Sequence, residues 1–257
     1  MIMLERGLSF LNTPNIPEKK IKVALVDKRI ESNIQFGFAQ RGIETIKLEG
    51  HSGLYPAISS HPDAIFHHLG GNLIIHAPGA DKSVLSTLEE LGFLLIEGEA
   101  ELTRKYPGTI YYNVARVGNL AFHNTKYTDK KLKELLYRLD IELVHVNQGY
   151  AKCAVSVVDE NSIITMDRGI ARIAQKKGLD VLVIEEERIL LPGFANGFIG
   201  GSTCLIDKKV LAVFGNIHKL KSAAQIINFL LQKDTKLVSL SEEPVIDIGS
   251  VIPLLTE

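Results

Sequence analysis

Short apolar runs and one longer amphipathic stretch follow one another in the same order four times along the chain. Each copy has a β-prone run, a turn rich in glycine, aspartate or asparagine, a second apolar run, the amphipathic stretch and a third apolar run. Leu73, Leu120, Ile163 and Leu211 mark equivalent points in the second runs, so the copies are spaced by 47, 43 and 48 residues. An internal repeat of this length predicts a fold built from equivalent units.

The amphipathic stretches are predicted to be helices that bury one face against a sheet. Leu132, Leu135, Leu136 and Leu139 recur three and four residues apart, as expected for one face of a helix. The predicted helices cover 81–92, 128–140, 167–178 and 218–233. Candidate N-cap and C-cap residues bound three of them: Asp81, Thr128 and Asp167 at the starts, Gly92 and Gly178 at the ends. Each copy is therefore predicted to be a strand–strand–helix–strand unit.

The two ends of the chain supply the pieces of a fifth unit. Residues 21–49 predict a strand, a helix and a strand without a first hairpin strand, and "EPVIDIGSVI" near the C-terminus is a strand without a partner. We expect Val245–Ile248 to pair beside Ile21–Val26, which would close a ring and protect two sheet edges. A Rossmann fold would alternate single strands with helices and leave the hairpins unexplained, and no glycine-rich phosphate loop follows a strand.

The predicted fold class is therefore α/β, a five-fold pseudosymmetric α/β propeller closed by the N- and C-terminal segments. Residues 1–257 are expected to form a single domain. Its approximate units are 21–61 (completed by 242–257), 62–106, 107–149, 150–193 and 194–241.

Composition narrows the class of partner. The formal net charge is −1, so no electrostatic argument favours nucleic acid or a membrane surface. No segment approaches the roughly 20 apolar residues of a membrane span, and Glu5 near the start argues against a signal peptide. Only two cysteines occur, too few for a disulfide framework, which makes a reducing cytoplasm the expected location.

Five units of this kind, joined through the two termini, resemble the pentein superfamily, the guanidine-group-modifying enzyme fold, and the chain looks closest to a small bacterial branch of it. Enzymatic branches include arginine and agmatine deiminases, dimethylarginine dimethylaminohydrolases and amidinotransferases; a ribosome anti-association factor is a non-catalytic member. The resemblance implies a cysteine near the start of the last full unit, a histidine from an earlier unit, and carboxylates that hold the guanidinium group. The thiolate would attack the guanidinium carbon and the histidine would transfer protons.

The motifs leave two alignments open for the nucleophile. "GGSTC", ending at Cys204, is similar to the GG-x-x-x-C approach of deiminases but is one residue shorter. The following "LIDKK" resembles "LINK" of the dimethylaminohydrolases and places Ser202 at the nucleophile position instead. "HPDAIFHHLGG" is similar to the "PDxVFxxD" strand of enzymatic penteins, with His68 where the last acid would stand, which counts against an ordinary arginine substrate.

If the ring is right, the first strands of the units line a central polar pocket, the usual place for a ligand. The expected chemistry is a cysteine-dependent hydrolase or transferase acting on a guanidino or related amidino small molecule, without cofactor or metal. The alternative is a non-catalytic binding protein like the ribosome factor. The candidate residues are Cys204 as nucleophile, His68 or His67 as proton carrier, and Asn113, Asn196, Ser202, Lys152 and Arg116 as substrate contacts. Cys153 lies on another first strand and is a weaker candidate.

Overall fold

The computed structural model describes residues 7–185 and 187–257 and contains five small sheets in a mixed α/β arrangement. Glu5, which bears on the expectation about a signal peptide, lies outside these residues. Four of the sheets are built alike. A hairpin of two antiparallel strands leads to a helix, and a third strand returns parallel to the second strand of the hairpin. The strand–strand–helix–strand order predicted for the four copies is therefore present.

The elements of these four sheets follow one another along the chain. The first sheet has β4 (Phe66–Gly70), β5 (Leu73–His76), α4 (Lys82–Glu90) and β6 (Leu94–Glu97). The second has β7 (Ala115–Val117), β8 (Leu120–His123), α5 (Lys130–Arg138) and β9 (Glu142–His145). The third has β10 (Val155–Asp159), β11 (Ser162–Thr165), α7 (Arg168–Lys176) and β12 (Asp180–Val183). The fourth has β13 (Thr203–Asp207), β14 (Val210–Val213), η3 (Ile217–Lys219), α8 (Ala223–Gln232) and β15 (Lys236–Ser239).

The fifth sheet joins the two ends of the chain, but with a different strand from the one predicted. Its order is β1 (Ser9–Phe10), β16 (Ile252–Thr256), β2 (Ile21–Asp27) and β3 (Glu44–Leu48), with α2 (Ser32–Ala39) between β2 and β3. The partner of β2 is β16, so the prediction that Val245–Ile248 takes this place was wrong. Pro253 made the last run a poor strand candidate, because proline cannot donate to a ladder. The ladder between β16 and β2 shifts register just after Pro253, which accommodates the proline.

Residues 245–248 instead connect the fourth sheet to the fifth. The N–H of Ile246 donates to the carbonyl of Phe214, and that of Ile248 to the carbonyl of Gly201. Gly249 and Ser250 then adopt left-handed backbone angles, with φ of 70° and 63°. This turn redirects the chain so that the run after it reaches β2.

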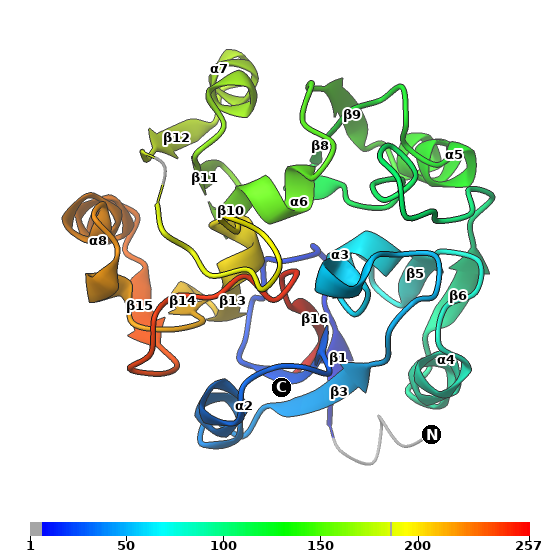
Figure 1. Cartoon of the computed structure of the whole chain (residues 1–257), viewed down its shortest axis with the longest axis horizontal. Helices are drawn as coiled ribbons and strands as arrows, with labels where there is room; N and C mark the ends of the chain where they lie inside the picture. Colours follow the sequence, from blue (N-terminus) through cyan, green and yellow to red (C-terminus); the bar gives the residue numbers. More distant parts are fainter. Residues whose placement is uncertain (1–6, 186) are drawn as a thin grey trace.

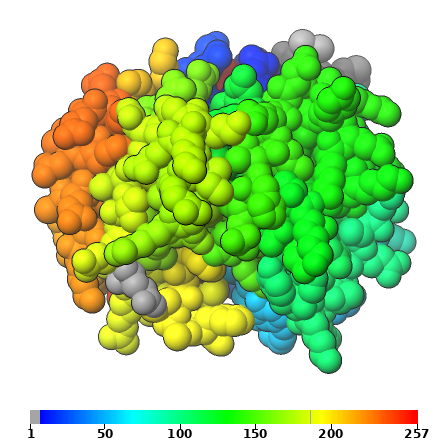
Figure 2. Space-filling view, turned by 90° about the horizontal axis from the view of Figure 1, so that it is seen from above, coloured from blue at the N-terminus to red at the C-terminus, as the bar shows by residue number. Residues whose placement is uncertain are grey.

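Helices α2, α4, α5, α7 and α8 lie at the outside of the molecule, and the sheets lie inside them (Figure 1). Figure 2 shows one side, on which the segment carrying α5 and the segment carrying α7 lie next to each other. Their sheets share an apolar cluster that contains Val117, Phe122, Val155 and Ile163. Packing between neighbouring units thus continues the core from one sheet to the next. Within the described part of the chain, no helix has the length and apolar character needed to cross a membrane.

Three short turns carry the chain through the middle of the molecule just before a first strand. They are α3 (Pro62–Ile65), α6 (Ala151–Ala154) and the 3-10 turn η2 (Gly200–Ser202); η1 (Pro56–Ile58) lies further upstream. Figure 1 shows α3 and α6 near the centre, facing each other. The first strands therefore begin later than the sequence predicted, and several candidate residues lie on turns instead of strands. A smaller correction concerns α5, whose N-cap is Asp129 and not Thr128, since the Asp129 carboxylate accepts from the N–H of Leu132 at 2.9 Å.

Candidate active site

A cavity of about 230 Å³ lies at the inner ends of these segments. Its lining includes Cys153, Asp247 and His61, and aromatic and aliphatic side chains form most of the remainder. The full lining is Tyr55, Ile58, His61, Tyr150, Cys153, Leu191, Phe194, Asn196, Phe198 and Asp247. A thiol, a carboxylate and an imidazole in one mostly apolar cavity make it the candidate active site.

Cys153 is held in position by hydrogen bonds from two other segments. Its thiol donates to Oδ2 of Asp63 at 3.0 Å, and Nδ2 of Asn113 donates to Sγ at 3.3 Å. Oδ1 of Asn113 accepts from the backbone N–H of Lys152 at 2.8 Å, which fixes α6 relative to the Asn113 segment. The sulfur is therefore fixed by a carboxylate from α3 and by an amide that also anchors its own backbone.

The Asp63 carboxylate is bonded on one oxygen only. Oδ2 also accepts from the Ser250 hydroxyl at 2.8 Å, and Nζ of Lys152 donates to that hydroxyl oxygen at 3.1 Å. Oδ1 is buried and has no hydrogen-bond partner among the described residues. A buried carboxylate oxygen without a hydrogen-bond partner is a costly arrangement.

Asp247 contributes a second buried carboxylate, which backbone groups hold in place. Its oxygens accept from the N–H of Phe198 at 2.8 Å and of Gly249 at 2.9 Å. A Cβ atom added at Gly201 would lie 1.9 Å from Oδ1 of Asp247, so only glycine allows this approach. A Cβ added at Gly200 would lie 2.6 Å from the carbonyl oxygen of Cys153. The two glycines of "GGSTC" thus permit close packing of the chain around the cavity.

His61 lies between this cavity and a smaller one of about 90 Å³, and it lines both. Its Nε2 is 3.8 Å from Oδ2 of Asp27, whose carboxylate is also bound by the Arg29 side chain. Burial lowers the pKa of His61 to about 4, against the opposite effect of Asp27. The imidazole is therefore neutral near pH 7 and can accept a proton.

Burial dominates the electrostatics of the thiol and the carboxylates. It raises the pKa of Asp63 to about 6 and, together with the charge of Asp63, that of Asp247 to about 7. Burial, assisted by both carboxylates, raises the pKa of the Cys153 thiol well above its usual range. The resting thiol is protonated, and a cation placed beside the carboxylates would lower its pKa.

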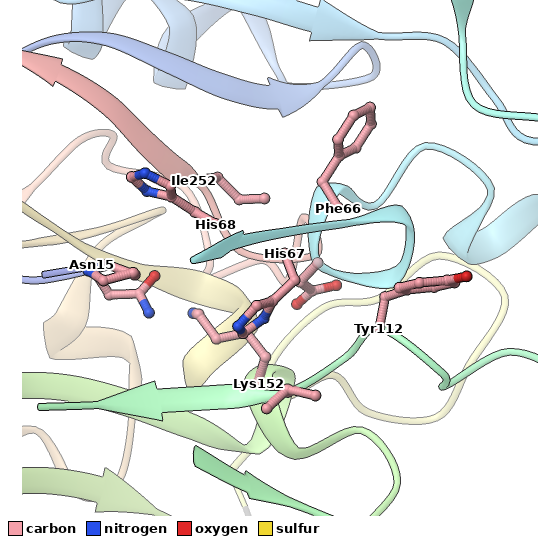
Figure 3. A pocket seen from close by; sticks show the side chains of 10 residues that line it. Asn15, Phe66, His67, His68, Tyr112, Lys152 and Ile252 are labelled. Atoms are coloured by element: carbon pink, nitrogen blue, oxygen red, sulfur yellow. The ribbon is translucent and has the colours of Figure 1, made fainter. Parts of the chain in front are cut away.

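A third cavity, of only about 20 Å³ and called the small cavity below, has Asp63 in its lining. Figure 3 shows it from close by. Figure 3 shows His67 pointing toward Lys152, whereas His68 turns toward Ile252. Burial lowers the pKa of His67 to about 3 and that of His68 to about 4. The space is about that of a single water molecule, so these two histidines and Lys152 line a place too small for a substrate.

The other candidates from the sequence lie apart from the 230 Å³ cavity, except Asn196. Cys204 packs in an apolar cluster on β13, its thiol donates to the carbonyl of Leu205, and burial raises its pKa to about 12. Ser202 is fully buried in η2, and its hydroxyl donates to the carbonyls of Phe198 and Ile199. Asn196 lines the cavity.

Arg116 is a buried side chain on β7, and its Nε donates to the carbonyl of Gly118. Burial lowers the Arg116 pKa to about 10, and its Nη1 has no hydrogen-bond partner within the described ranges. Across residues 7–185 and 187–257, no group of three or more His, Cys, Asp or Glu side chains is arranged to hold a metal ion.

Asp63, Asp247 and His61 were not among the residues predicted from the sequence. Asp63 belongs to the segment "HPDAIF", but the resemblance to the pentein motif singled out the later acid position, where this chain has His68. Asp247 precedes a Gly-Ser turn in a segment predicted to be a strand. The available signal was the local one: an acid inside an apolar run requires a partner or a function.

Comparison with known proteins adds a family and a fold to this geometry. The model described as "Family of unknown function (DUF6873)" matches residues 25–252. The chain belongs to this family. No curated protein matches the DUF6873 chain in sequence.

Solved structures with different sequences share its fold. The inosamine-phosphate amidinotransferase of Streptomyces griseus has a TM-score of 0.60 at 9% identity, with 96% of this chain and 97% of that chain covered. DDAH from Pseudomonas aeruginosa, in complex with citrulline, has a TM-score of 0.55 at 9% identity, with 86% of this chain and 92% of that chain covered. The C. jejuni agmatine deiminase has a TM-score of 0.54 at 13% identity, with 92% of this chain and 91% of that chain covered. The DUF6873 chain therefore has the pentein fold, as the sequence predicted.

Proposed function

We propose that this protein is an enzyme in which Cys153 attacks the central carbon of a small guanidino or amidino compound. The observation that carries the proposal is the thiol of Cys153 in the lining of the 230 Å³ cavity, hydrogen-bonded to Asp63 at 3.0 Å, with the Asp247 carboxylate in the same lining. The amidinotransferase and agmatine deiminase with this fold act on compounds of the corresponding class by their names. The thiol nucleophile of the proposal is Cys153 and not Cys204, which is packed among apolar side chains.

The two carboxylates suit a planar cation. Charged N–H groups of a guanidinium or amidinium would pair with Asp247, which lines the cavity. The charge of the cation would also act on Asp63, which accepts from the neighbouring Cys153 thiol. The same positive charge would stabilise the Cys153 thiolate, whose pKa the carboxylates otherwise raise. The cationic substrate thus helps to activate the nucleophile that attacks it.

The reaction then proceeds in two halves. Asp63 accepts the thiol proton, and the thiolate forms a C–S bond with the amidino carbon. A C–N bond breaks, and the leaving amine takes its electron pair together with a proton from Asp63. In hydrolysis, water attacks the same carbon and loses a proton to His61. The C–S bond then breaks, and the sulfur leaves with its electron pair and takes the proton from His61 to become the thiol again. The ureido product, which forms in its protonated state, releases its proton to the departed amine. In transfer, an acceptor amine replaces the water.

The proposal includes a ring of five units closed through the termini, the finer form of the fold. The pairing of β16 with β2 supports it, since it joins the last strand of the chain to the first long one. Asp63, Asn113, Cys153, Gly201 and Asp247 each come from a different unit in this arrangement. Asp63 and Asn113 bond to Cys153, and Gly201 packs against Asp247, so residues from all five units gather around the thiol. This favours catalysis at the centre over the alternative of a non-catalytic binding protein.

Alkylation of the native protein tests the proposal. We expect 2-chloroacetamidine, a cation, to modify Cys153 at pH 7.5 at least tenfold faster than neutral 2-chloroacetamide, relative to their rates with free cysteine. Mass spectrometry locates the modified residue. C204A should keep this labelling and C153A should abolish it. Labelling of Cys204 first, or of neither cysteine, would refute the proposed role of Cys153.

A second variant tests whether the Asp247 carboxylate causes the preference of Cys153 for the cationic reagent. D247N should reduce the preference for the amidine reagent to near that of free cysteine, because the charge partner is lost. Circular dichroism shows whether this variant folds. If it does not, benzamidine in the wild-type protein replaces the test: it should protect Cys153 from chloroacetamidine, and lack of protection would contradict cation binding beside the thiol.

A further inference from the structure

Aromatic rings make up much of the wall of the 230 Å³ cavity, and they determine which ligand groups besides the cationic head can bind there. Four aromatic side chains from three segments line it: Tyr55, Tyr150, Phe194 and Phe198. The rings of Tyr55 and Phe194 are 5.5 Å apart at 50°, and those of Tyr150 and Phe198 are 6.5 Å apart at 30°. Such pairs leave ring faces and edges available for another flat group.

The two tyrosine hydroxyls are already occupied. They hydrogen-bond each other at 3.1 Å, and that of Tyr150 also bonds the Thr109 hydroxyl at 2.7 Å. Both tyrosines therefore offer a ligand mainly ring surface. Their mutual bond also fixes the two rings relative to each other, so the apolar wall is formed before a ligand binds.

Of the described residues in the lining, Asp247 carries the charge of the cavity, which is negative. Among the described lining residues there is no lysine or arginine, and the one basic side chain, His61, is neutral because burial lowers its pKa to about 4. Nζ of Lys152 is bonded to Ser250 and faces the small cavity. Arg29 is bound to Asp27 and to the carbonyl of Pro56.

An α-carboxylate would find no opposite charge in these walls and would be repelled by Asp247. Transfer of an unpaired carboxylate from water to an apolar site is strongly unfavourable. An uncharged ring has no such penalty and gains contact with the aromatic wall. The cavity, at about 230 Å³, is smaller than the roughly 300–1,000 Å³ usual for drug-sized ligands, so one ring beyond the cationic head suffices to fill it.

We propose that the substrate is an amidino or guanidino compound with an uncharged, flat apolar substituent, and not one with the amino-acid end of arginine. This rests on the proposed function, since it takes the cationic head to lie beside Cys153 and Asp247. Phe194 is the specificity-determining residue at the outer end. Its ring is 49% exposed, so it contributes contact area to a ligand at little cost to the core when it is changed.

Binding of four matched ligands to C153A, which cannot react, tests the inference. The ligands are benzylguanidine, n-butylguanidine, agmatine and L-arginine, measured by isothermal titration calorimetry at pH 7.5. Benzylguanidine should bind at least tenfold more tightly than arginine. Adding F194A should weaken benzylguanidine about fivefold, as expected for loss of one aromatic contact, and butylguanidine less than twofold. F36A, which removes an exposed ring from α2, is the control and should change neither.

The outcomes separate this inference from the proposed function. Equal or tighter binding of arginine overturns it, as does an equal effect of F194A on the benzyl and butyl compounds. If Cys153 still prefers chloroacetamidine in either case, the proposed function stands and only the substrate class is wrong. If no ligand binds and Cys153 is unreactive, both fail.

Discussion

Replacement of Asp63 by asparagine should make the protein more stable at alkaline pH while it impairs the chemistry. Oδ2 of Asp63 accepts from Cys153 and Ser250, and the amide oxygen of asparagine can do the same. Its NH2 group would take the position of Oδ1, which has no partner among the described residues. Asp63 lines the small cavity together with His67, whose Nε2 is equally unpaired within the described structure and can serve as an acceptor. The exchange therefore removes a buried charge without removing the bonds of the side chain.

The raised pKa of Asp63 determines whether the free energy of unfolding rises or falls with pH. Burial raises this pKa from 3.8 to about 6, so the folded protein holds this proton more tightly than the unfolded chain. The stability that this proton contributes is fully present below the pKa of the unfolded chain, 3.8. It is lost as the pH rises through the pKa of the folded protein, about 6. A difference of about 2 units corresponds to about 3 kcal/mol above pH 7. About half of these 3 kcal/mol of stability is already lost at pH 5, so the further loss between pH 5 and pH 8 is about 1.5 kcal/mol.

Urea denaturation at pH 5 and pH 8, followed by circular dichroism, measures this difference. D63N should gain about 1.5 kcal/mol relative to wild type on going from pH 5 to pH 8. D140N is the matched control: Asp140 is exposed, and asparagine tolerates its left-handed backbone angle of 55°. It should show no gain. If wild type and D63N lose or gain stability in parallel between the two pH values, the account of Asp63 as a carboxyl strained by burial is refuted.

Three further outcomes check the packing that supports the site. G201A should destabilise the protein by about 3 kcal/mol in urea and lower the reactivity of the thiol, since its Cβ would overlap the Asp247 carboxylate. D81A should lower the free energy of unfolding by about 1 kcal/mol in the same assay, because Asp81 only caps its helix. D129A should lower it by about 3 kcal/mol, because Asp129 caps its helix and also accepts from two further backbone N–H groups. A chain that ends at Val251 lacks β16, which lies between β1 and β2, and should fail to give a cooperative thermal transition; a wild-type-like transition would contradict its place in the core.

The repeat was predictable from the sequence because each unit is specified locally. Turn residues such as Gly70 and Gly71, which adopt φ of 113° and 57°, set the hairpins, and each helix has its own apolar face. The closing strand was not predictable in the same way. It contains Pro253 and is stabilised by β2, more than 220 residues away, so no local preference marked it.

The position of the thiol was harder to predict than the fold. Strand alternation would decide which side chains face the centre only if the candidates lay on strands. Cys153 and Asn113 lie on or beside short turns that precede a strand, and a turn rotates its side chains by an amount that depends on its length. Cys204, two residues into β13, follows the alternation and points into an apolar cluster.

The two cysteines show why sequence position alone is a poor guide to reactivity. Both are buried and burial raises the pKa of both, so neither is a thiolate at rest. The difference lies in their neighbours: the wall around Cys153 contains carboxylates that a cation can satisfy, whereas Cys204 is surrounded by apolar carbon. Only the first environment changes when a charged ligand arrives. A cysteine whose activation depends on the substrate stays protected from other electrophiles until that substrate binds.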